Sequence, residues 1–245
     1  MPPLSMLIKP ASGNCNLRCK YCFYHSLTEN RSVPSYGMMS LVLLEELVQK
    51  SLQYAEMSCT FAFQGGEPTL VGLDFYRKLI EYQNKYNTKN IQIINAIQTN
   101  GVVINDSWAE FLAENKFLVG ISLDGTRNIH DMNRVDSMNS GSFTRAMNAI
   151  ELFNKHQVEY NILTVVNAIT SRHAVKIYNF FKKQGFKYLQ FIPCLDPLNE
   201  APGKHPYSLT PEKYGCFLKT LFDLWYEDIG NCETLEKKKT IYTKY

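Results

Sequence analysis

The sequence lacks a second group of cysteines. Three of its seven cysteines, Cys15, Cys19 and Cys22, lie within eight residues, and the other four stand alone. Structural zinc sites usually take four ligands, commonly from two separated CxxC pairs, and that pattern is not met. An odd, scattered set also does not suit a secreted disulfide scaffold, so we expect a reducing compartment and a cytoplasmic protein. Three lone cysteines are predicted to be buried small hydrophobic residues: Cys59, Cys194 and Cys216.

Long apolar runs and strong charge are also absent. No stretch approaches the roughly 20 apolar residues of a spanning helix, and the N-terminal residues show neither a basic start nor a cleavage site. The formal net charge of the 245 residues is only +3. These features predict no membrane segment, no signal peptide and no nucleic-acid partner.

Short apolar runs alternate with amphipathic segments along the chain. Strands are predicted at 4–9, 59–63, 91–97, 117–123, 160–166 and 188–192, with a cysteine-bearing loop at 11–36. Helices are predicted at 40–56, 74–86, 108–114, 142–156, 172–184 and 210–226. This alternation predicts an α/β protein with parallel strands and helices outside them. It leaves open whether the sheet curls into a barrel or forms a doubly wound sheet, but in either case ligands bind at the carboxyl ends of the strands.

The cysteine-rich segment 15–22 indicates a metal centre. A cubane iron–sulfur cluster normally takes four thiolates, so three thiolates leave one iron with an open coordination position. An open position is where a metal centre does chemistry. The alternative is a zinc site in which His25, three residues after Cys22, is the fourth ligand.

The pattern CxxxCxxC, followed by Phe23 and then by Gln64-Gly65-Gly66-Glu67-Pro68, resembles the radical S-adenosylmethionine (radical SAM) superfamily. The resemblance implies a partial (β/α)6 barrel over residues 1–230. It also implies one [4Fe-4S] cluster on Cys15, Cys19 and Cys22, with SAM on the fourth iron. Reductive cleavage of SAM would then release a 5′-deoxyadenosyl radical. A zinc site would leave the glycine motif unexplained.

The same resemblance assigns a set of SAM contacts. They are Tyr21, Gly65, Gly66, Glu67, Ser122, Arg134 and Leu195. The glycine motif would receive the amino group, Ser122 and Arg134 the carboxylate and ribose, and Tyr21 and Leu195 the adenine. Arginine suits a carboxylate because its planar fork can bind both oxygens. Each residue also has an ordinary alternative: Ser122 as a strand cap, Arg134 as a solvated charge and Leu195 as a core residue.

A finer resemblance extends to about residue 228. Phe61-Ala-Phe-Gln-Gly-Gly-Glu-Pro-Thr, Gln98-Thr-Asn-Gly and Ser122-Leu-Asp-Gly are similar to anaerobic sulfatase-maturating enzymes. Those enzymes oxidise a cysteine or serine of a sulfatase polypeptide to Cα-formylglycine, and an electron donor such as flavodoxin or ferredoxin is implied. Candidate substrate-binding residues are Tyr24, Gln64, Gln98 and Asn100. The alternative is that these residues only close turns, and no catalytic side chain is assigned.

The sequence departs from that family after the last predicted helix. Family members continue into a cysteine-rich SPASM region with two auxiliary clusters, whereas residues 231–245 form a divergent segment that we expect to be flexible. A truncated or frame-shifted product that cleaves SAM but makes little formylglycine is therefore expected. Two alternatives remain open: another radical SAM peptide-modifying enzyme, and a non-catalytic cluster-binding fragment.

Overall fold

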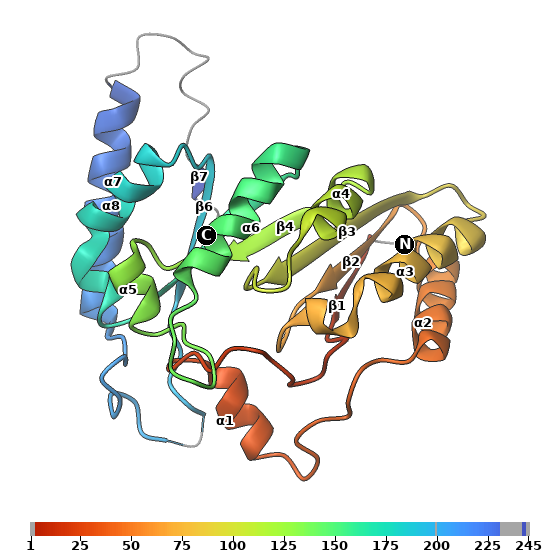
Figure 1. Ribbon diagram of the computed structural model, residues 1–245, viewed down its shortest axis with the longest axis horizontal. Helices are drawn as coiled ribbons and strands as arrows, with labels where there is room; N and C mark the ends of the chain where they lie inside the picture. The colour runs from red at the N-terminus through yellow and green to blue at the C-terminus, as the bar shows by residue number, and fades with distance from the viewer. Residues whose placement is uncertain (1–2, 199, 231–241, 244–245) are drawn as a thin grey trace. The chain divides into compact units, whose positions relative to one another are not determined.

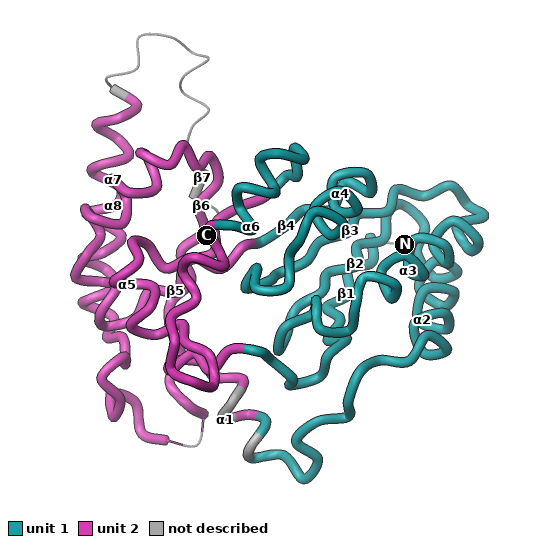
Figure 2. Tube along the Cα trace, in the orientation of Figure 1, with its two compact units in different colours: residues 1–16, 28–120, 148–159 teal, residues 17–27, 121–147, 160–245 magenta. Residues whose placement is uncertain are grey.

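A computed structural model describes residues 3–198, 200–230 and 242–243 (Figure 1). The chain divides into two compact units, which Figure 2 shows in two colours. Unit 1 comprises residues 1–16, 28–120 and 148–159, and unit 2 comprises residues 17–27, 121–147 and 160–245. The boundary falls inside the predicted cysteine-bearing loop, so Cys15 belongs to unit 1 whereas Cys19 and Cys22 belong to unit 2.

Unit 1 contains β1 (Leu4–Ile8), β2 (Ser58–Phe63), β3 (Gln92–Thr99) and the start of β4 (Leu118–Ser122). β1 and β3 both pair in parallel with β2, with Ile8 opposite Phe63 and Phe63 opposite Ile97. The carboxyl ends of these strands therefore lie along one edge of the sheet. The segments that follow them, including the glycine motif after β2 and Gln98-Thr-Asn-Gly at the end of β3, meet at that edge.

The helices of unit 1 are α2 (Leu41–Tyr54), the 3-10 turn η1 (Pro68–Val71), α3 (Leu73–Tyr86) and α4 (Asp106–Glu114), together with most of α6 (Phe143–His156). Tyr76 of α3 is fully buried, and its ring makes edge-to-face contacts with Phe63, Trp108 and Phe117 at centroid distances of 5.1, 5.3 and 6.2 Å. Its hydroxyl donates to the carbonyl of Pro68 at 3.1 Å. The aromatic core therefore anchors the turn that follows the glycine motif.

Unit 2 contains the end of β4, β5 (Tyr160–Val166), β6 (Tyr188–Pro193) and β7 (Tyr242–Thr243). β5 and β6 pair in parallel, with Ile162 opposite Leu189 and Val166 opposite Pro193. The helices are most of α1 (Phe23–Glu29), α5 (Arg127–Asp131), the 3-10 turn η2 (Thr170–His173), α7 (Ala174–Lys183) and α8 (Pro211–Gly230). Phe217 of α8 is buried against Phe191 of β6, with ring centroids 5.3 Å apart.

The strands follow one another across the sheet in the order of the sequence, from β1 to β7. A doubly wound sheet would reverse its strand order at a switch point, so that alternative is wrong. The sheet does not close, because β1 and β7 are the two ends of this order. The six predicted strands are all present, and the prediction of a partial barrel of α/β type is confirmed.

Some sequence-based expectations differ from the structure or fall outside it. The segment predicted as a loop at 11–36 contains α1, and α5 was not predicted. The predicted flexible segment at 231–245 lies outside the described residues except for the two residues of β7. Within the described part of the chain, no helix is both long and apolar enough to cross a membrane.

Candidate functional site

Two glycines shape the turn after β2. Gly65 and Gly66 have φ values of +88° and +58°, a region that side chains disfavour. A Cβ atom on Gly66 would collide with the backbone carbonyl of Asn14. The next residue, Glu67, donates its backbone N–H to that same carbonyl at 2.8 Å. The glycine turn therefore lies directly against the residue that precedes Cys15.

The carboxylate of Glu67 is the centre of a buried hydrogen-bond network, and the residue is only 1% exposed. Oε1 accepts from the Thr69 backbone N–H at 3.1 Å, from the Thr69 hydroxyl at 2.6 Å and from the Thr99 hydroxyl at 2.7 Å. Oε2 accepts from the Asn100 backbone N–H at 2.8 Å. Burial raises the pKa of Glu67, although these donors act in the opposite direction. The side chain thus links the end of β2 to the end of β3.

Asn100 extends the network to the first cysteine. Its Oδ1 accepts from the Val102 backbone N–H at 2.9 Å. Its Nδ2 donates to Asn16 Oδ1 at 2.7 Å and to Cys15 Sγ at 3.8 Å. Asn100 was predicted as a substrate-binding residue, and its side chain faces Cys15 and Asn16. The glycine turn, the turn after β3 and Cys15 therefore form one connected assembly within unit 1.

Unit 2 has its own buried network around Asp124, which follows β4 and is fully buried. Asp124 Oδ2 accepts from the Tyr21 hydroxyl at 2.5 Å and from Arg134 Nε at 2.9 Å. Asp124 Oδ1 accepts from the Val165 backbone N–H at 3.1 Å. The Arg134 guanidinium also lies 5.5 Å from the centroid of the Tyr21 ring. Arg134 is 7% exposed, so the alternative of a solvated surface charge is wrong.

Burial and neighbouring charges shift the pKa values of Arg134 and Tyr21. Burial is the largest single influence and lowers the pKa of the Arg134 guanidinium, but Asp124, Tyr21 and Cys19 together outweigh it, so the pKa is raised. Burial also raises the pKa of the Tyr21 hydroxyl. The backbone of the cysteine segment is tied to the same region, because Arg18 N–H donates to the Val135 carbonyl at 2.6 Å and Lys20 N–H donates to the Asn133 carbonyl at 3.0 Å.

His130 connects the backbone of Asp124 to that of Arg134. The Asp124 backbone N–H donates to His130 Nδ1 at 3.3 Å, so Nδ1 is the acceptor and Nε2 carries the proton. Nε2 then lies 2.9 Å from the Ser142 hydroxyl, which donates to the Arg134 carbonyl at 2.9 Å. Burial lowers the pKa of His130 to about 3, so the ring stays neutral. His130 therefore holds the backbone beside Arg134 through Ser142.

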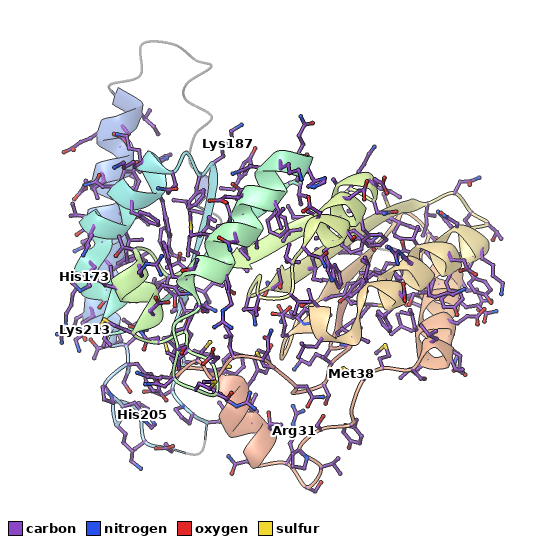
Figure 3. All side chains as sticks on the ribbon, in the orientation of Figure 1. Arg31, Met38, His173, Lys187, His205 and Lys213 are labelled. Atoms are coloured by element: carbon purple, nitrogen blue, oxygen red, sulfur yellow. The ribbon has the colours of Figure 1, made fainter. Side chains whose placement is uncertain are left out.

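The loop after β6 contains Leu195, another predicted SAM contact. Asp196 accepts from the Ser208 hydroxyl at 2.6 Å and from the Gly203 N–H at 2.8 Å, which closes this loop on itself. His205, labelled in Figure 3, stacks on the ring of Tyr207 with centroids 4.7 Å apart. Leu195 is 55% exposed, so the alternative of a core residue is wrong.

The remaining predicted site residues differ in burial. Ser122, Tyr24 and Gln64 are half-buried, and Gln98 is exposed. Cys59 is buried as predicted, but Cys216 is exposed on α8 and that prediction is wrong. Cys194 is half-buried, and burial followed by the charge of Asp196 raises the pKa of its thiol to about 12.

Cys15, Cys19 and Cys22 are all half-buried. No three His, Cys, Asp or Glu side chains of the described residues are grouped so that they could hold one metal ion. A cubane differs from a single ion, because its thiolates bind separate irons and stand farther apart. The zinc alternative needs the side chain of His25, which lies outside the described residues.

Sequence reasoning missed Asp124, Thr99 and His130 as members of these networks. Asp124 was named only within the segment Ser122-Leu-Asp-Gly, although a carboxylate directly after a buried strand is a signal for a strand-end site. Thr99 and His130 gave no comparable signal, because a lone threonine or histidine has many ordinary uses.

Comparison with known proteins gives concordant results. The model of the radical SAM superfamily matches residues 10–181, more than half of the chain. The chain is 61% identical over 228 residues to the cysteine-type anaerobic sulfatase-maturating enzyme of Clostridium novyi (strain NT), which covers 93% of this chain and 61% of that protein.

Solved structures are similar as well. Native anSMEcpe with bound AdoMet superposes with a TM-score of 0.92 at 55% identity, covering 98% of this chain and 64% of that one. Native anSMEcpe with bound AdoMet and Kp18Cys peptide gives a TM-score of 0.91 at 54% identity, covering 98% and 64% respectively. The chain therefore spans less than two thirds of the length of these proteins.

Proposed function

Because the chain belongs to the radical SAM superfamily, we propose that Cys15, Cys19 and Cys22 hold one [4Fe-4S] cluster and leave its fourth iron for S-adenosylmethionine. When bound, the two groups supply hydrogen-atom abstraction, which no side chain of the protein provides alone. The observation that carries the proposal is the trio of thiols within eight residues, flanked by a glycine turn that any side chain at Gly66 would obstruct. A soft donor set of this kind suits an iron–sulfur cluster.

The proposed roles of the glycine turn follow from its hydrogen bonds. The carboxylate of Glu67 already accepts four donors. The amino group of SAM would therefore be received by backbone carbonyls of the turn rather than by that carboxylate. Gly65 and Gly66 allow the approach because they carry no side chain.

In unit 2, the proposed role of Arg134 follows from its pairing. Its Nε is committed to Asp124, so the two terminal nitrogens of the guanidinium would receive the carboxylate of SAM. Tyr21 is fixed by the same carboxylate and would border the adenine, together with Leu195. Ser122 would contact the carboxylate or the ribose.

We further propose that the substrate is a cysteine of a sulfatase polypeptide, which is oxidised to Cα-formylglycine. The support is the 61% identity to a protein named as a cysteine-type anaerobic sulfatase-maturating enzyme. One hydrogen atom would pass from Cβ to the 5′-deoxyadenosyl radical. Loss of one proton, and of one electron that returns to the oxidised flavodoxin or ferredoxin, would then take the thiol to a thioaldehyde. Hydrolysis then gives the aldehyde and hydrogen sulfide. Tyr24, Gln64 and Gln98 are proposed to border the peptide.

The proposed partners are the sulfatase polypeptide and a one-electron donor such as flavodoxin or ferredoxin. The odd number and scattered positions of the seven cysteines support a reducing, cytoplasmic location. Asn100 was predicted to border the peptide too, and its side-chain nitrogen faces Cys15.

The first experiment tests the cluster and SAM. Anaerobic reconstitution is expected to give about four irons per chain, and dithionite should then produce 5′-deoxyadenosine from SAM. Cys19→Ala should abolish both, whereas the exposed Cys216→Ala should keep both. Full iron loading and SAM cleavage in Cys19→Ala would refute the proposal.

The second experiment separates SAM cleavage from peptide oxidation. Sulfatase-motif peptides with cysteine, serine or alanine at the target position are incubated with the reduced enzyme and analysed by mass spectrometry. Aldehyde is expected only with the cysteine peptide, and in the small yield predicted from the sequence. Production of 5′-deoxyadenosine without any aldehyde would remove sulfatase maturation and leave the radical SAM activity in place.

A further inference from the structure

The orientation of the Asn100 side chain is determined by its neighbours. Its Oδ1 accepts from the Val102 backbone N–H at 2.9 Å, so the nitrogen, and not the oxygen, faces the cysteine. One Nδ2 hydrogen serves Asn16 Oδ1 at 2.7 Å, and the other points to Cys15 Sγ at 3.8 Å. Both polar atoms of the amide are therefore engaged, and the donor to the sulfur is the nitrogen.

The backbone of Asn100 is equally fixed. Its N–H donates to Glu67 Oε2 at 2.8 Å, and the preceding Thr99 donates its hydroxyl to Glu67 Oε1 at 2.7 Å. The residue is 7% exposed. A side chain held at both amide atoms and at its backbone nitrogen has a defined position, and the N–H···S contact is part of that built arrangement.

Binding of Cys15 to iron would make this contact more important, because a ligating sulfur is a thiolate. The protonated thiol can donate to Asn16 Oδ1 at 3.9 Å, but a thiolate has no hydrogen to donate. A thiolate is a stronger acceptor, so the Asn100 N–H becomes a hydrogen bond to a charged sulfur. Hydrogen bonds to the sulfurs are one of the factors that set the reduction potential of an iron–sulfur cluster.

We propose that Asn100 is a positioning residue that donates a hydrogen bond to the Cys15 thiolate and so raises the reduction potential of the bound cluster. This inference rests on the proposed cluster. The physical reason is that the donor withdraws negative charge from the sulfur, and reduction adds a negative charge to the cluster. The reduced form therefore gains more from the hydrogen bond than the oxidised form. A reduction potential that is too low would slow electron transfer from the donor protein to the cluster, because the cluster would be harder to reduce.

The test compares Asn100→Ser and Asn100→Asp with the wild type after anaerobic reconstitution. Both substitutions keep the backbone N–H that binds Glu67, and both remove the amide donor. The midpoint potential is measured by a redox titration followed by electron paramagnetic resonance. Asn128→Asp, at an exposed position on α5, is the matched control for the added charge.

We expect a downward shift of the midpoint potential in Asn100→Ser and a larger downward shift in Asn100→Asp, since its carboxylate lies beside the thiolate. Asn128→Asp should match the wild type. Resonance Raman spectra of the oxidised cluster should also show shifted iron–cysteine stretching bands in both variants. If Asn100→Asp does not load iron, the uncharged Asn100→Ser decides. A wild-type potential and wild-type Raman bands in a loaded Asn100→Ser cluster would overturn the proposal.

The failure of this inference is distinguishable from the failure of the proposed function. A wild-type chain that takes up no iron–sulfur cluster would remove the proposed function before any potential is measured. A loaded wild-type cluster with unchanged potentials in the variants would remove only the role of Asn100.

Discussion

Replacement of Glu67 tests whether the buried carboxylate stabilises the fold around the glycine turn. Glu67→Gln keeps one oxygen for the three donors that share Oε1, but it places an amide nitrogen opposite the Asn100 N–H. Glu67→Ala removes both oxygens. The two variants therefore strand different numbers of buried donors at the same position.

The magnitudes follow from the stranded backbone groups. One buried N–H without an acceptor costs about 1–3 kcal/mol, so Glu67→Gln should lower the free energy of unfolding by about that amount. Glu67→Ala strands the N–H groups of both Thr69 and Asn100, which are 1% and 7% exposed. Its loss should therefore be about 2–6 kcal/mol.

The assay is urea unfolding of the metal-free, reduced protein followed by circular dichroism. Glu110→Gln, at an exposed position on α4, is the control and should stay within about 0.5 kcal/mol of the wild type. The expected order of stability is wild type, then Glu67→Gln, then Glu67→Ala. If Glu67→Ala is as stable as the wild type, the carboxylate does not organise these turns and the reasoning is wrong.

Two further predictions use single positions. Gly66→Ala and Gly185→Ala both force alanine to a positive φ, of +58° and +72°, but only the first also meets a backbone carbonyl. Gly66→Ala should therefore be less stable than Gly185→Ala by about 1–3 kcal/mol in urea unfolding, and equal stability would contradict the close approach. Burial lowers the pKa of His130 from 6.5 to about 3, so the unfolded chain binds a proton between these pH values while the folded chain does not. Wild-type stability should thus fall by roughly 1.4 kcal/mol per pH unit from this group as the pH drops below 6.5. His130→Gln should lack that part of the slope, and an identical slope in both proteins would show that the ring is not buried in its neutral form.

The strands were predictable because their apolar runs are clear. The expected ranges 59–63 and 160–166 agree with β2 (Ser58–Phe63) and β5 (Tyr160–Val166) to within a residue. The helix predicted at 40–56 corresponds to α2, and the hydroxyl of Ser40 caps it by accepting from the Leu43 N–H at 3.2 Å. Local sequence carries these signals, so no knowledge of distant contacts was needed.

The short helices were not predictable from the same signals. α1 (Phe23–Glu29) has seven residues and α5 (Arg127–Asp131) has five. Helices of this length are not stable by themselves, so tertiary packing has to hold them. In α5, the burial of Ile129 and His130 supplies that packing, and it depends on residues far along the chain.

The candidate site also contains residues that the sequence identified and hydrogen-bond partners that it did not. Cys15 and the glycine turn were identified from the motif to which they belong, and the predicted parallel sheet independently placed ligands at the carboxyl ends of the strands. The partners could not be predicted, because the hydrogen bond between Tyr21 and Asp124 joins residues 103 positions apart. Such pairing depends on side-chain direction at the strand ends, which the sequence pattern does not specify.

The dipeptide Asn100-Gly101 affects the chemical stability of the protein during storage. In flexible chains, the glycine nitrogen after an asparagine readily attacks the side-chain carbonyl carbon. Loss of ammonia leaves a cyclic imide, which water opens to aspartate or isoaspartate. Here the Gly101 N–H donates to the Thr99 hydroxyl at 3.1 Å, and the amide of Asn100 is held at both of its atoms. Folded stocks should keep their asparagine, whereas material stored in denaturant should deamidate at this peptide bond. Peptide mass mapping of the two stocks would show it, and a refolded preparation would then carry an acid beside its first cysteine before any cluster is assembled.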